Sequence, residues 1–348
     1  MTKTAFITGI TGQDGAYLAR LLLEKGYEVH GGVRRTSALH TTRLEALKID
    51  AHVQLHDFEL GELNNCHRIL KKVAIDEFYN LAAQSFVGTS WDLPIYAGDI
   101  NGLGVARILD SLRTLSPGTR FYQASTSEMF GRVDEMPQVE TTRFYPRSPY
   151  GVAKLYGHHI TINYRESFGM HASCGILFNH ESPLRGKEFV TGKITQALAR
   201  IAHGGSEACV LGNLDARRDW GFAGDYVDGM WRMLQQDKAD DYVLATGVTS
   251  SVRDFVDYAA EALGMGIEWT GEGVCERGVE RTSGKVVVTV SDAFFRPAEV
   301  EHLLGDASKA RRVLGWTPTM DVRQIAAMMA RHDYDSIAAQ HRGKPAGP

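Results

Sequence analysis

Thr4-Ala-Phe-Ile-Thr-Gly-Ile-Thr-Gly-Gln-Asp-Gly15 is the stretch that decides the fold of this chain. Its first five residues form an apolar run suited to a buried parallel strand, and three glycines follow at intervals of three residues. An apolar stripe over residues 16–23 predicts a helix ending at Lys25-Gly26, and residues 27–33 predict a second strand. Dinucleotide-binding folds begin in this way, so we expect an α/β protein with a doubly wound parallel (Rossmann) sheet.

The glycine turn is the expected cofactor site. Glycines permit the tight turn, the close approach of a pyrophosphate and the close packing of helix on strand. The helix N-terminus then offers free N–H groups and the positive end of its dipole. The spacing is Gly-x-x-Gly-x-x-Gly rather than Gly-x-Gly-x-x-Gly. We assign the following turn residues to the cofactor: Gly9, Thr11, Gly12, Gln13, Asp14 and Gly15.

The residues after the second strand indicate which cofactor binds. An acidic residue there would bind the ribose 2′-hydroxyl of NAD, whereas this chain has Arg34-Arg35-Thr36-Ser37. Arginines suit a 2′-phosphate because they make paired charge-assisted hydrogen bonds, so Arg34, Arg35 and Ser37 favour NADP. The alternatives are a solvated loop and arginines that reach a partner subunit.

Later strands should deliver more site residues to the same edge of the sheet. Residues 52–58 predict a third strand with Asp57 and Phe58 near the adenine, and residues 77–80 predict a fourth. Small side chains after the fourth strand would let the backbone pass close to the cofactor, and they are Leu81, Ala82, Ala83 and Ser85. A helix over 99–113 and a strand over 119–125 follow. Functional residues should therefore meet outside the carboxyl ends of the strands.

The candidate catalytic residues follow the strand at 119–125. Tyr150 and Lys154 are four residues apart, and Pro149 is suited to the start of a helix, so both side chains should share one face. A lysine beside the phenol should lower the tyrosine pKa and make Tyr150 a base for an alcohol. Thr126 and Glu128 would hold the substrate and supply a second base. The alternative is an exposed helix face without function.

Composition limits the class of protein. The chain has 348 residues, a formal net charge of -4 and a hydrophobic content of 43%, which is ordinary for a globular protein. No basic block suggests nucleic acid, and no apolar run is long enough for a membrane span. Four scattered cysteines lack metal-ligand spacing, so we expect no metal and a reduced, cytoplasmic enzyme without a signal peptide.

The second half of the chain reads as a smaller substrate domain. We expect a strand over 171–178, a helix over 190–203, an aromatic loop after 217–220, and a loop at 294–300 that opens into a helix. A strand over 242–246 would return to the first sheet. We therefore divide the chain into a cofactor domain, 1–178 with a return near 222–250, and a substrate domain that takes most of 179–348.

Several longer strings resemble the GDP-mannose 4,6-dehydratases, a family of extended short-chain dehydrogenases. Nearly the whole chain shares the likeness, which rests on these strings: Thr8-Gly-Ile-Thr-Gly-Gln-Asp-Gly15, Phe121-Tyr-Gln-Ala-Ser-Thr-Ser-Glu128, Phe144-Tyr-Pro-Arg-Ser-Pro-Tyr150, Asn163-Tyr-Arg-Glu-Ser167, Gly175-Ile-Leu-Phe-Asn-His-Glu-Ser-Pro183, Arg218-Asp-Trp-Gly221, Phe295-Arg-Pro-Ala-Glu-Val300 and Leu314-Gly-Trp-Thr-Pro318. Asn-Leu-Ala-Ala at 80–83 also fits.

The resemblance implies a dehydration without net redox change. Tyr150 with Lys154 would take the proton of the sugar 4-hydroxyl while the C4 hydride goes to NADP⁺. Glu128 would then remove the C5 proton, water would leave from C6, and the hydride would return to C6. Thr126 would hydrogen-bond the 4-hydroxyl. A carboxylate besides the tyrosine is surplus for a plain dehydrogenase and is needed for an elimination.

The resemblance also implies binding residues. It adds Asn179 and His180 to the cofactor site, and it places around a GDP-hexose the residues Ser85, Thr126, Asn179, Glu181, Val190, Lys193, Gly212, Arg218, Arg296 and Glu299. Arginines and Lys193 suit a diphosphate, whereas surface ion pairs and a structural role for Glu181 are the alternatives. Family members usually form homodimers or homotetramers, and the segment from Arg34 to Arg43 would reach a neighbouring cofactor.

Five positions depart from the family pattern. Phe86, Leu184, Gly192, Phe222 and Gly224 stand where the pattern has histidine, arginine, arginine, histidine and lysine. The absence of basic side chains at these positions bears on which substrate binds more than on which reaction is catalysed. Two other functions therefore stay open: an epimerase or dehydratase for another GDP-hexose, and an inactive NADP-binding scaffold. Glu128 argues against a plain 4-epimerase, and the intact set Thr126, Glu128, Tyr150 and Lys154 argues against a scaffold.

Overall fold

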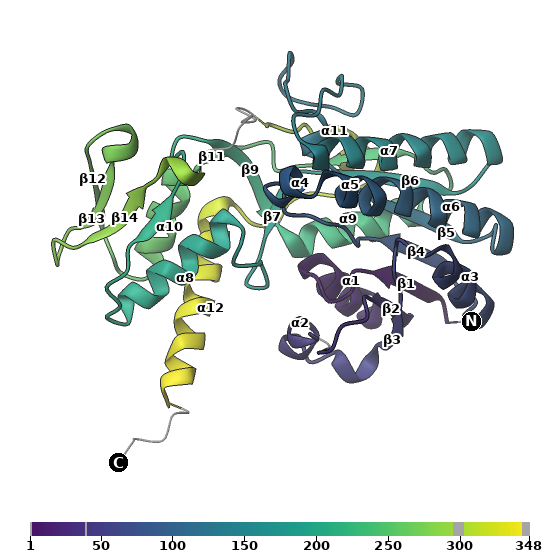
Figure 1. Cartoon of the computed structure of the whole chain (residues 1–348), viewed down its shortest axis with the longest axis horizontal. Coiled ribbons are helices and arrows are strands. Elements are labelled where there is room, and N and C mark those ends of the chain that lie inside the picture. Colours follow the sequence, from purple (N-terminus) through teal and green to yellow (C-terminus); the bar gives the residue numbers. More distant parts are fainter. Residues whose placement is uncertain (1, 39, 295–302, 343–348) are drawn as a thin grey trace.

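A seven-stranded parallel sheet forms the larger part of the computed structural model, which describes residues 2–38, 40–294 and 303–342. Its strands are β1 (Thr4–Thr8), β2 (Glu28–Val33), β3 (Gln54–Asp57), β4 (Glu77–Asn80), β5 (Arg120–Thr126), β6 (Ala172–Leu177) and β10 (Asp241–Leu244). They lie in the order β10-β6-β5-β4-β1-β2-β3, and every neighbouring pair is parallel (Figure 1). This is the strand order of a Rossmann sheet with one strand added at the β6 edge, so the predicted fold class is confirmed.

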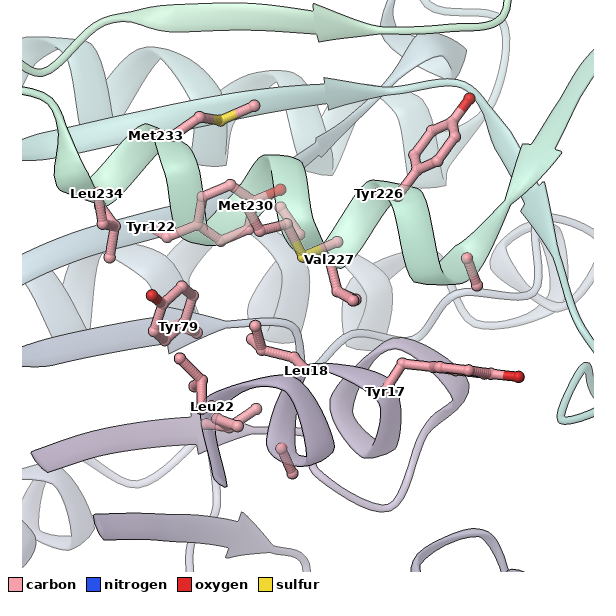
Figure 2. Close-up of a cluster of buried hydrophobic side chains, with 14 of the residues drawn as sticks. Tyr17, Leu18, Leu22, Tyr79, Tyr122, Tyr226, Val227, Met230, Met233 and Leu234 are labelled. Atoms are coloured by element: carbon pink, nitrogen blue, oxygen red, sulfur yellow. The ribbon is translucent and has the colours of Figure 1, made fainter. Parts of the chain in front are cut away.

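Helices cover both faces of this sheet. They are α1 (Gln13–Glu24), α2 (Thr42–Ala46), α3 (Leu63–Lys72), α4 (Thr89–Asp92), α5 (Pro94–Gly98), a π-helical turn (Asp99–Leu103), α6 (Gly104–Leu115), α7 (Pro149–Phe168), α9 (Ala223–Gln235) and α11 (Ser308–Leu314). Successive strand residues point to opposite faces. Phe78 therefore joins the core under α3 and α6, whereas Tyr79 joins the core between the sheet and α1 and α9. Figure 2 shows Leu18 and Leu22 of α1 and Met230 of α9 around Tyr79 in that second core.

The remaining strands form two smaller sheets, one next to the large sheet and one at the far end of the molecule (Figure 1). One contains β7 (Asn179–Glu181), β9 (Arg217–Phe222) and β11 (Thr249–Ser251); the other contains β8 (Cys209–Leu211), β12 (Ile267–Thr270), β13 (Arg277–Glu280) and β14 (Val286–Val290). The helices α8 (Val190–Ala202), α10 (Val252–Ala262) and α12 (Val322–Arg342) pack together with them around a separate apolar core. No helix within the described ranges is both long and apolar enough to span a membrane.

Several sequence expectations for this region can now be judged. The helix over 190–203 and the returning strand near 242–246 are confirmed as α8 and β10, and β10 pairs with β6. The aromatic loop expected after 217–220 is wrong, because β9 continues to Phe222 and α9 begins at Ala223. The Phe222 ring packs edge-on against Tyr17, and this tertiary contact favours ordered structure over a loop. Most of the expected loop at 294–300 lies outside the described residues.

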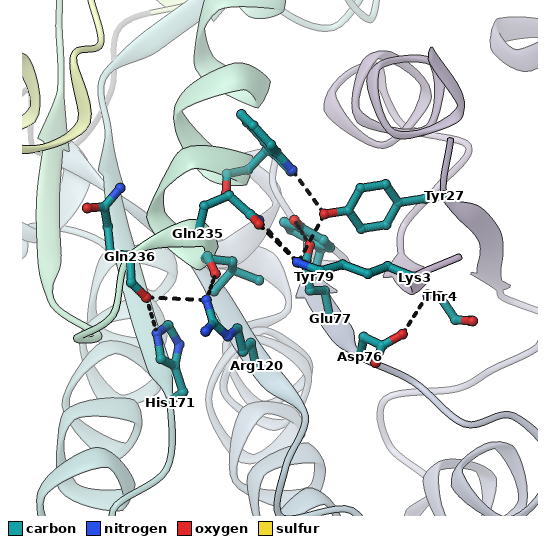
Figure 3. Close-up of polar contacts among 12 residues, drawn as sticks. Lys3, Thr4, Tyr27, Asp76, Glu77, Tyr79, Arg120, His171, Gln235 and Gln236 are labelled. Atoms are coloured by element: carbon teal, nitrogen blue, oxygen red, sulfur yellow. Dashed lines mark hydrogen bonds and ion pairs between the residues drawn. The ribbon is translucent and has the colours of Figure 1, made fainter. Parts of the chain in front are cut away.

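A buried carboxylate ties the sheet to α9 at the end opposite the strand carboxyl ends. Glu77 is fully buried, and its Oε1 accepts hydrogen bonds from Lys3 Nζ at 2.9 Å, Tyr27 OH at 3.1 Å and Gln235 Nε2 at 3.1 Å. Its Oε2 accepts one from Tyr79 OH at 2.7 Å. Figure 3 shows these side chains converging from β4, from α9 and from the residues just before β1 and β2.

Replacing Glu77 with leucine should lower the free energy of unfolding by about 1–3 kcal/mol, because the buried Tyr79 hydroxyl loses its acceptor and three partly exposed donors lose theirs. Urea unfolding followed by circular dichroism measures this. Glu24→Leu is the matched control: the Glu24 side chain is 65% exposed and lies 3.7 Å from Arg20, and we expect a loss of no more than about 1 kcal/mol. Equal losses in the two variants would contradict the role given to Glu77.

Candidate active site

Tyr150 and Lys154 lie on the first turns of α7, against the carboxyl end of β5. Ser148 caps this helix by accepting a hydrogen bond from the Gly151 amide at 3.0 Å, and Pro149 is its first residue. Both side chains are buried, at 8% and 4% exposure. Lys154 Nζ donates to the carbonyl of Ala124 in β5 at 2.9 Å. The alternative of an exposed helix face is therefore wrong.

Thr126 connects Tyr150 to Glu128. The Thr126 hydroxyl is hydrogen-bonded to Tyr150, and it accepts the backbone amide of Glu128 at 3.2 Å. Gly151 brings the start of α7 close to this turn, because a Cβ there would lie 2.9 Å from the Glu128 carbonyl oxygen. The four predicted catalytic residues thus come from β5, the turn after it and α7, and the structure brings them together.

The electrostatics of Tyr150 differ from the sequence expectation. Burial raises the pKa of Tyr150 well above its usual value, while the hydrogen bond from Thr126 opposes this and the charge of Glu128 adds to it. Burial also lowers the pKa of Lys154 to about 8. The expectation that Lys154 lowers the tyrosine pKa is wrong for this structure, because Lys154 points to Ala124 with Nζ 5.9 Å from the Tyr150 ring centre.

The glycine turn fits a dinucleotide. Gly12 is the N-cap of α1 and supplies no side-chain cap, so the first amides of this helix keep the free donors that a pyrophosphate needs. Gly9 has φ +70°, and a Cβ there would lie 2.9 Å from the Ala82 nitrogen. Thr8 Oγ1 accepts hydrogen bonds from the backbone amides of Leu81 and Ala82, each at 3.0 Å. The turns after β1 and β4 therefore pack together, and half-buried Ala83 continues the second one.

The predicted 2′-phosphate residues lie on the surface after β2. Arg34, Arg35 and Ser37 are exposed. Arg35 Nη1 lies 3.2 Å from Asp57 Oδ2, and Arg34 Nη1 donates to the hydroxyl of Tyr96 at 3.0 Å. Phe58 is only 6% exposed and packs on Phe6, so its ring belongs to the core and its side chain does not line a cofactor site.

Gln13 and Asp14 contact β7 and the residue after it. Asp14 Oδ2 lies 2.8 Å from His180 Nε2, and Gln13 Nε2 donates to the His180 carbonyl at 3.1 Å. The hydroxyl of Ser182 donates to Gln13 Oε1 at 2.8 Å. Three residues expected to touch the cofactor therefore touch one another, and they join the glycine turn to β7.

The predicted substrate residues form two groups. Glu181 is buried, and its Oε2 accepts from Thr191 Oγ1 at 2.5 Å and lies 3.0 Å from Arg185 Nε. Burial raises the pKa of Glu181, and Arg185 and Thr191 oppose the shift. Asn179 is half-buried and lies on β7 two positions before Glu181. Val190 is half-buried and is the first residue of α8.

The second group converges on Phe294. Lys193 Nζ lies 3.6 Å from the centre of the Phe294 ring, and a Cβ at Gly212 would lie 2.8 Å from the Phe294 carbonyl oxygen. Arg218 is mostly buried on β9, where its Nη1 donates to the carbonyl of Arg217 at 2.8 Å. Ser85 is exposed. Arg296 and Glu299 lie outside the described residues.

Arg185 is a site residue to which the sequence reasoning gave no role. Its guanidinium lies 3.6 Å from the Phe189 ring centre and forms the ion pair with Glu181. Phe189 in turn meets Phe86 edge-on, with ring centres 6.1 Å apart. The sequence signal for this ion pair was the position of Arg185, four residues after Glu181. Only the fold shows that Glu181 is buried.

All five residues that depart from the family pattern make tertiary contacts in this structure. A Cβ at Gly192 would lie 2.7 Å from the Gly186 carbonyl oxygen, so an arginine does not fit here without a backbone shift. A Cβ at Gly224 would lie 2.3 Å from the Phe222 ring, so these two residues fit as a pair. Phe86 makes the contact with Phe189, and Leu184 packs against the core beside the sheet.

Sequence comparison places this arrangement in a known family. A family model described as GDP-mannose 4,6 dehydratase matches residues 6–329. The chain belongs to this family. A GDP-mannose 4,6-dehydratase of Sinorhizobium fredii is 55% identical over 338 residues, which is 95% of this chain and 96% of the relative. The GDP-mannose 4,6 dehydratase of Homo sapiens is 49% identical over 341 residues, which is 96% of this chain and 92% of the relative.

Solved structures of lower identity share the fold. A UDP-glucose 4-epimerase of Thermotoga maritima with UDP-glucose has a TM-score of 0.80 at 20% identity, covering 96% of this chain and 99% of its own. A structure of RMD from Pseudomonas aeruginosa complexed with NADPH has a TM-score of 0.74 at 20% identity, covering 96% and 100%. At this identity the likeness shows the fold alone.

Proposed function

We propose that this family member converts GDP-D-mannose into GDP-4-keto-6-deoxy-D-mannose and water, as a hydro-lyase that depends on NADP. The observation that carries the proposal is Glu128, held beside Tyr150 through Thr126. A dehydrogenase needs one base, whereas an elimination needs a second base for a carbon acid. Two relatives named GDP-mannose 4,6-dehydratase, at 55% and 49% identity, support the choice of substrate.

Each catalytic residue has a distinct task in this reaction. Thr126 hydrogen-bonds the sugar 4-hydroxyl, and Tyr150 takes the proton of that hydroxyl. Lys154 holds β5 to α7 through the Ala124 carbonyl, and this bond keeps the start of the helix beside the end of the strand. NADP, when bound, supplies hydride acceptance at C4 and hydride return at C6. Glu128 removes the C5 proton, which the 4-keto group has made acidic, and the 6-hydroxyl takes up a proton and leaves as water. C5 then takes up a second proton, so the two protons removed by Tyr150 and Glu128 balance those gained by the water and by C5.

The cofactor and substrate contacts are proposals of the same kind. For NADP they are the turn residues Gly9, Thr11, Gly12 and Gly15, the segment from Leu81 to Ser85, Asn179, and Arg34, Arg35 and Ser37, whose exposure leaves them available to a 2′-phosphate. For the GDP-hexose they are Glu181, Val190, Lys193, Gly212 and Arg218, together with Arg296 and Glu299. We place the cofactor in residues 1–178 with the return over 222–250, and most substrate contacts in 179–348.

The direct test is incubation of the purified protein with GDP-mannose and a catalytic amount of NADP⁺. We expect a product lighter by one water and no net NADPH, and weaker activity when NAD⁺ replaces NADP⁺. An unchanged substrate in the presence of bound NADP⁺ would refute the proposal. It would then favour the alternative of another GDP-hexose, for which the altered surroundings of Phe86 and Gly192 are the reason.

We also propose that two copies associate through an apolar groove of about 980 Å³ between α4, α5, the π-helical turn and α7. Large side chains on it are exposed: Trp91 43%, Ile95 85%, Leu103 47%, Val152 56% and Tyr156 45%. An apolar surface of this extent indicates a protein interface, and a second copy would bury the same groove symmetrically. A cytoplasmic location remains a proposal that suits four cysteines without a disulfide.

Ile95→Glu should convert the protein into monomers in analytical ultracentrifugation at micromolar concentration, because a charge would be buried without a partner. Val248→Glu is the control, since Val248 is 66% exposed and lies outside the groove. A monomeric wild-type protein, or an Ile95→Glu variant that still associates, would contradict this interface.

A further inference from the structure

His180 has an acceptor at each of its ring nitrogens. Nδ1 lies 2.7 Å from the backbone carbonyl oxygen of Phe178, and Nε2 lies 2.8 Å from Asp14 Oδ2. The Phe178 carbonyl oxygen only accepts hydrogen bonds, so Nδ1 carries a proton. An ionised Asp14 carboxylate also only accepts, so with Asp14 ionised Nε2 carries a proton as well and the ring is a cation. With Asp14 ionised, the geometry therefore pairs an imidazolium with a carboxylate.

The surroundings of the ring stabilise a positive charge. His180 is 8% exposed, and its ring stacks on Tyr226 of α9 with centres 4.4 Å apart, which suits a cation over an aromatic face. The charged groups that face the pair are Arg185 and Glu181 from the chain around β7, and Lys154 of α7 on the Asp14 side.

The titration directions agree with this geometry. Burial would raise the pKa of Asp14, but the charge and hydrogen bond of His180 hold it at about 2. Burial would lower the pKa of His180, but Asp14 raises it above its usual value, while Arg185 acts weakly against that shift. The attraction between the two groups therefore outweighs the cost of burying them.

We propose that His180 is a protonated positioning residue that neutralises Asp14 within the glycine turn, and not a direct ligand of the cofactor. Asp14 lies in the first turn of α1, where a lone carboxylate would repel a pyrophosphate. The imidazolium cancels this charge and leaves the helix amides as the dominant local field. Because Gln13 also binds the His180 carbonyl, the pair fixes the turn relative to β7 and so to Glu181.

The protonation state can be tested without any cofactor. Nitrogen-15 NMR of the whole protein should show both His180 nitrogens protonated at pH 7.5, with assignment through the loss of signals in His180→Gln. In Asp14→Asn the amide can donate to Nε2, so His180 should become neutral with a single protonated nitrogen. A neutral His180 in the wild-type protein would overturn the proposal.

Cofactor affinity separates positioning from direct contact; this part of the inference rests on the proposed NADP dependence. His180→Gln should weaken NADP⁺ binding, measured by calorimetry, by about 10-fold or more, because one uncompensated charge easily supplies 1.4 kcal/mol. The double variant Asp14→Asn/His180→Gln should recover to within about threefold of wild type. A double variant as weak as His180→Gln would show that His180 contacts the cofactor, and it would overturn the proposal.

The pH dependence gives an independent readout. Since the pKa of His180 is raised in the folded protein, its contribution is fully present below the usual pKa of histidine and is lost as the pH rises through the raised pKa. NADP⁺ affinity should therefore fall on alkalisation in the wild-type protein more steeply than in the double variant. Parallel profiles would contradict the role of the pair. If the wild-type protein contains the imidazolium but binds no NADP⁺, the proposed function is refuted while the ion pair between His180 and Asp14 is not.

Discussion

Glu128→Gln should reduce dehydration of GDP-mannose by about 10³-fold while oxidation at C4 continues. General bases contribute roughly 10²–10⁴-fold, and a glutamine amide of the same shape does not accept the C5 proton. Glu128 meets Thr126 through its backbone amide, so the substitution leaves that contact in place. Bound NADPH should accumulate to one equivalent, visible by its absorbance, and mass spectrometry should find little product.

Glu135→Gln is the control for this variant. Glu135 is exposed on the segment that follows the same turn, so the loss of its charge should leave turnover within about twofold of wild type. Deuterium uptake from heavy water into the product at C5 gives a second check. Wild-type turnover or wild-type uptake in Glu128→Gln would remove Glu128 from the proposed mechanism.

Tyr150→Phe should lower kcat by about 10²–10⁴-fold, because the variant lacks the atom that takes the proton of the 4-hydroxyl. The phenylalanine ring keeps the packing of α7, so NADP⁺ affinity should change by no more than a few-fold. Burial holds the pKa of Tyr150 above its usual value, so the wild-type rate should rise with pH across the neutral range. The variant should lose that rise, and initial rates from pH 6 to 8 measure both effects.

Tyr164→Phe provides the matched comparison on the same helix. The Tyr164 hydroxyl lies 3.5 Å from Asp110 and outside the groove, so its removal should leave kcat unchanged. If Tyr150→Phe kept more than a tenth of wild-type turnover, another group would have to take the proton. Lys154 would be the first candidate, because its pKa of about 8 already allows a neutral fraction at the upper end of this range.

Local sequence was sufficient for the frame of the site. The apolar run Thr4–Thr8, the glycine turn and the helical stripe of α1 together predict a strand, a turn and a helix in that order, and the structure contains all three. The spacing of Tyr150 and Lys154 similarly fixed their common face once Pro149 and Ser148 began α7. α12 was missed, although it packs on α8 and α10 around the second core.

The sequence by itself determined which residues stand at the carboxyl ends of the strands, because strand and helix periodicity are properties of neighbouring residues. Only the tertiary structure decided how those residues are charged and what they touch. Asp14 and His180 are 166 positions apart, and burial rather than Lys154 governs the pKa of Tyr150. Desolvation and ion pairing depend on everything that surrounds a group, and in this chain those surroundings come from segments that meet only after folding.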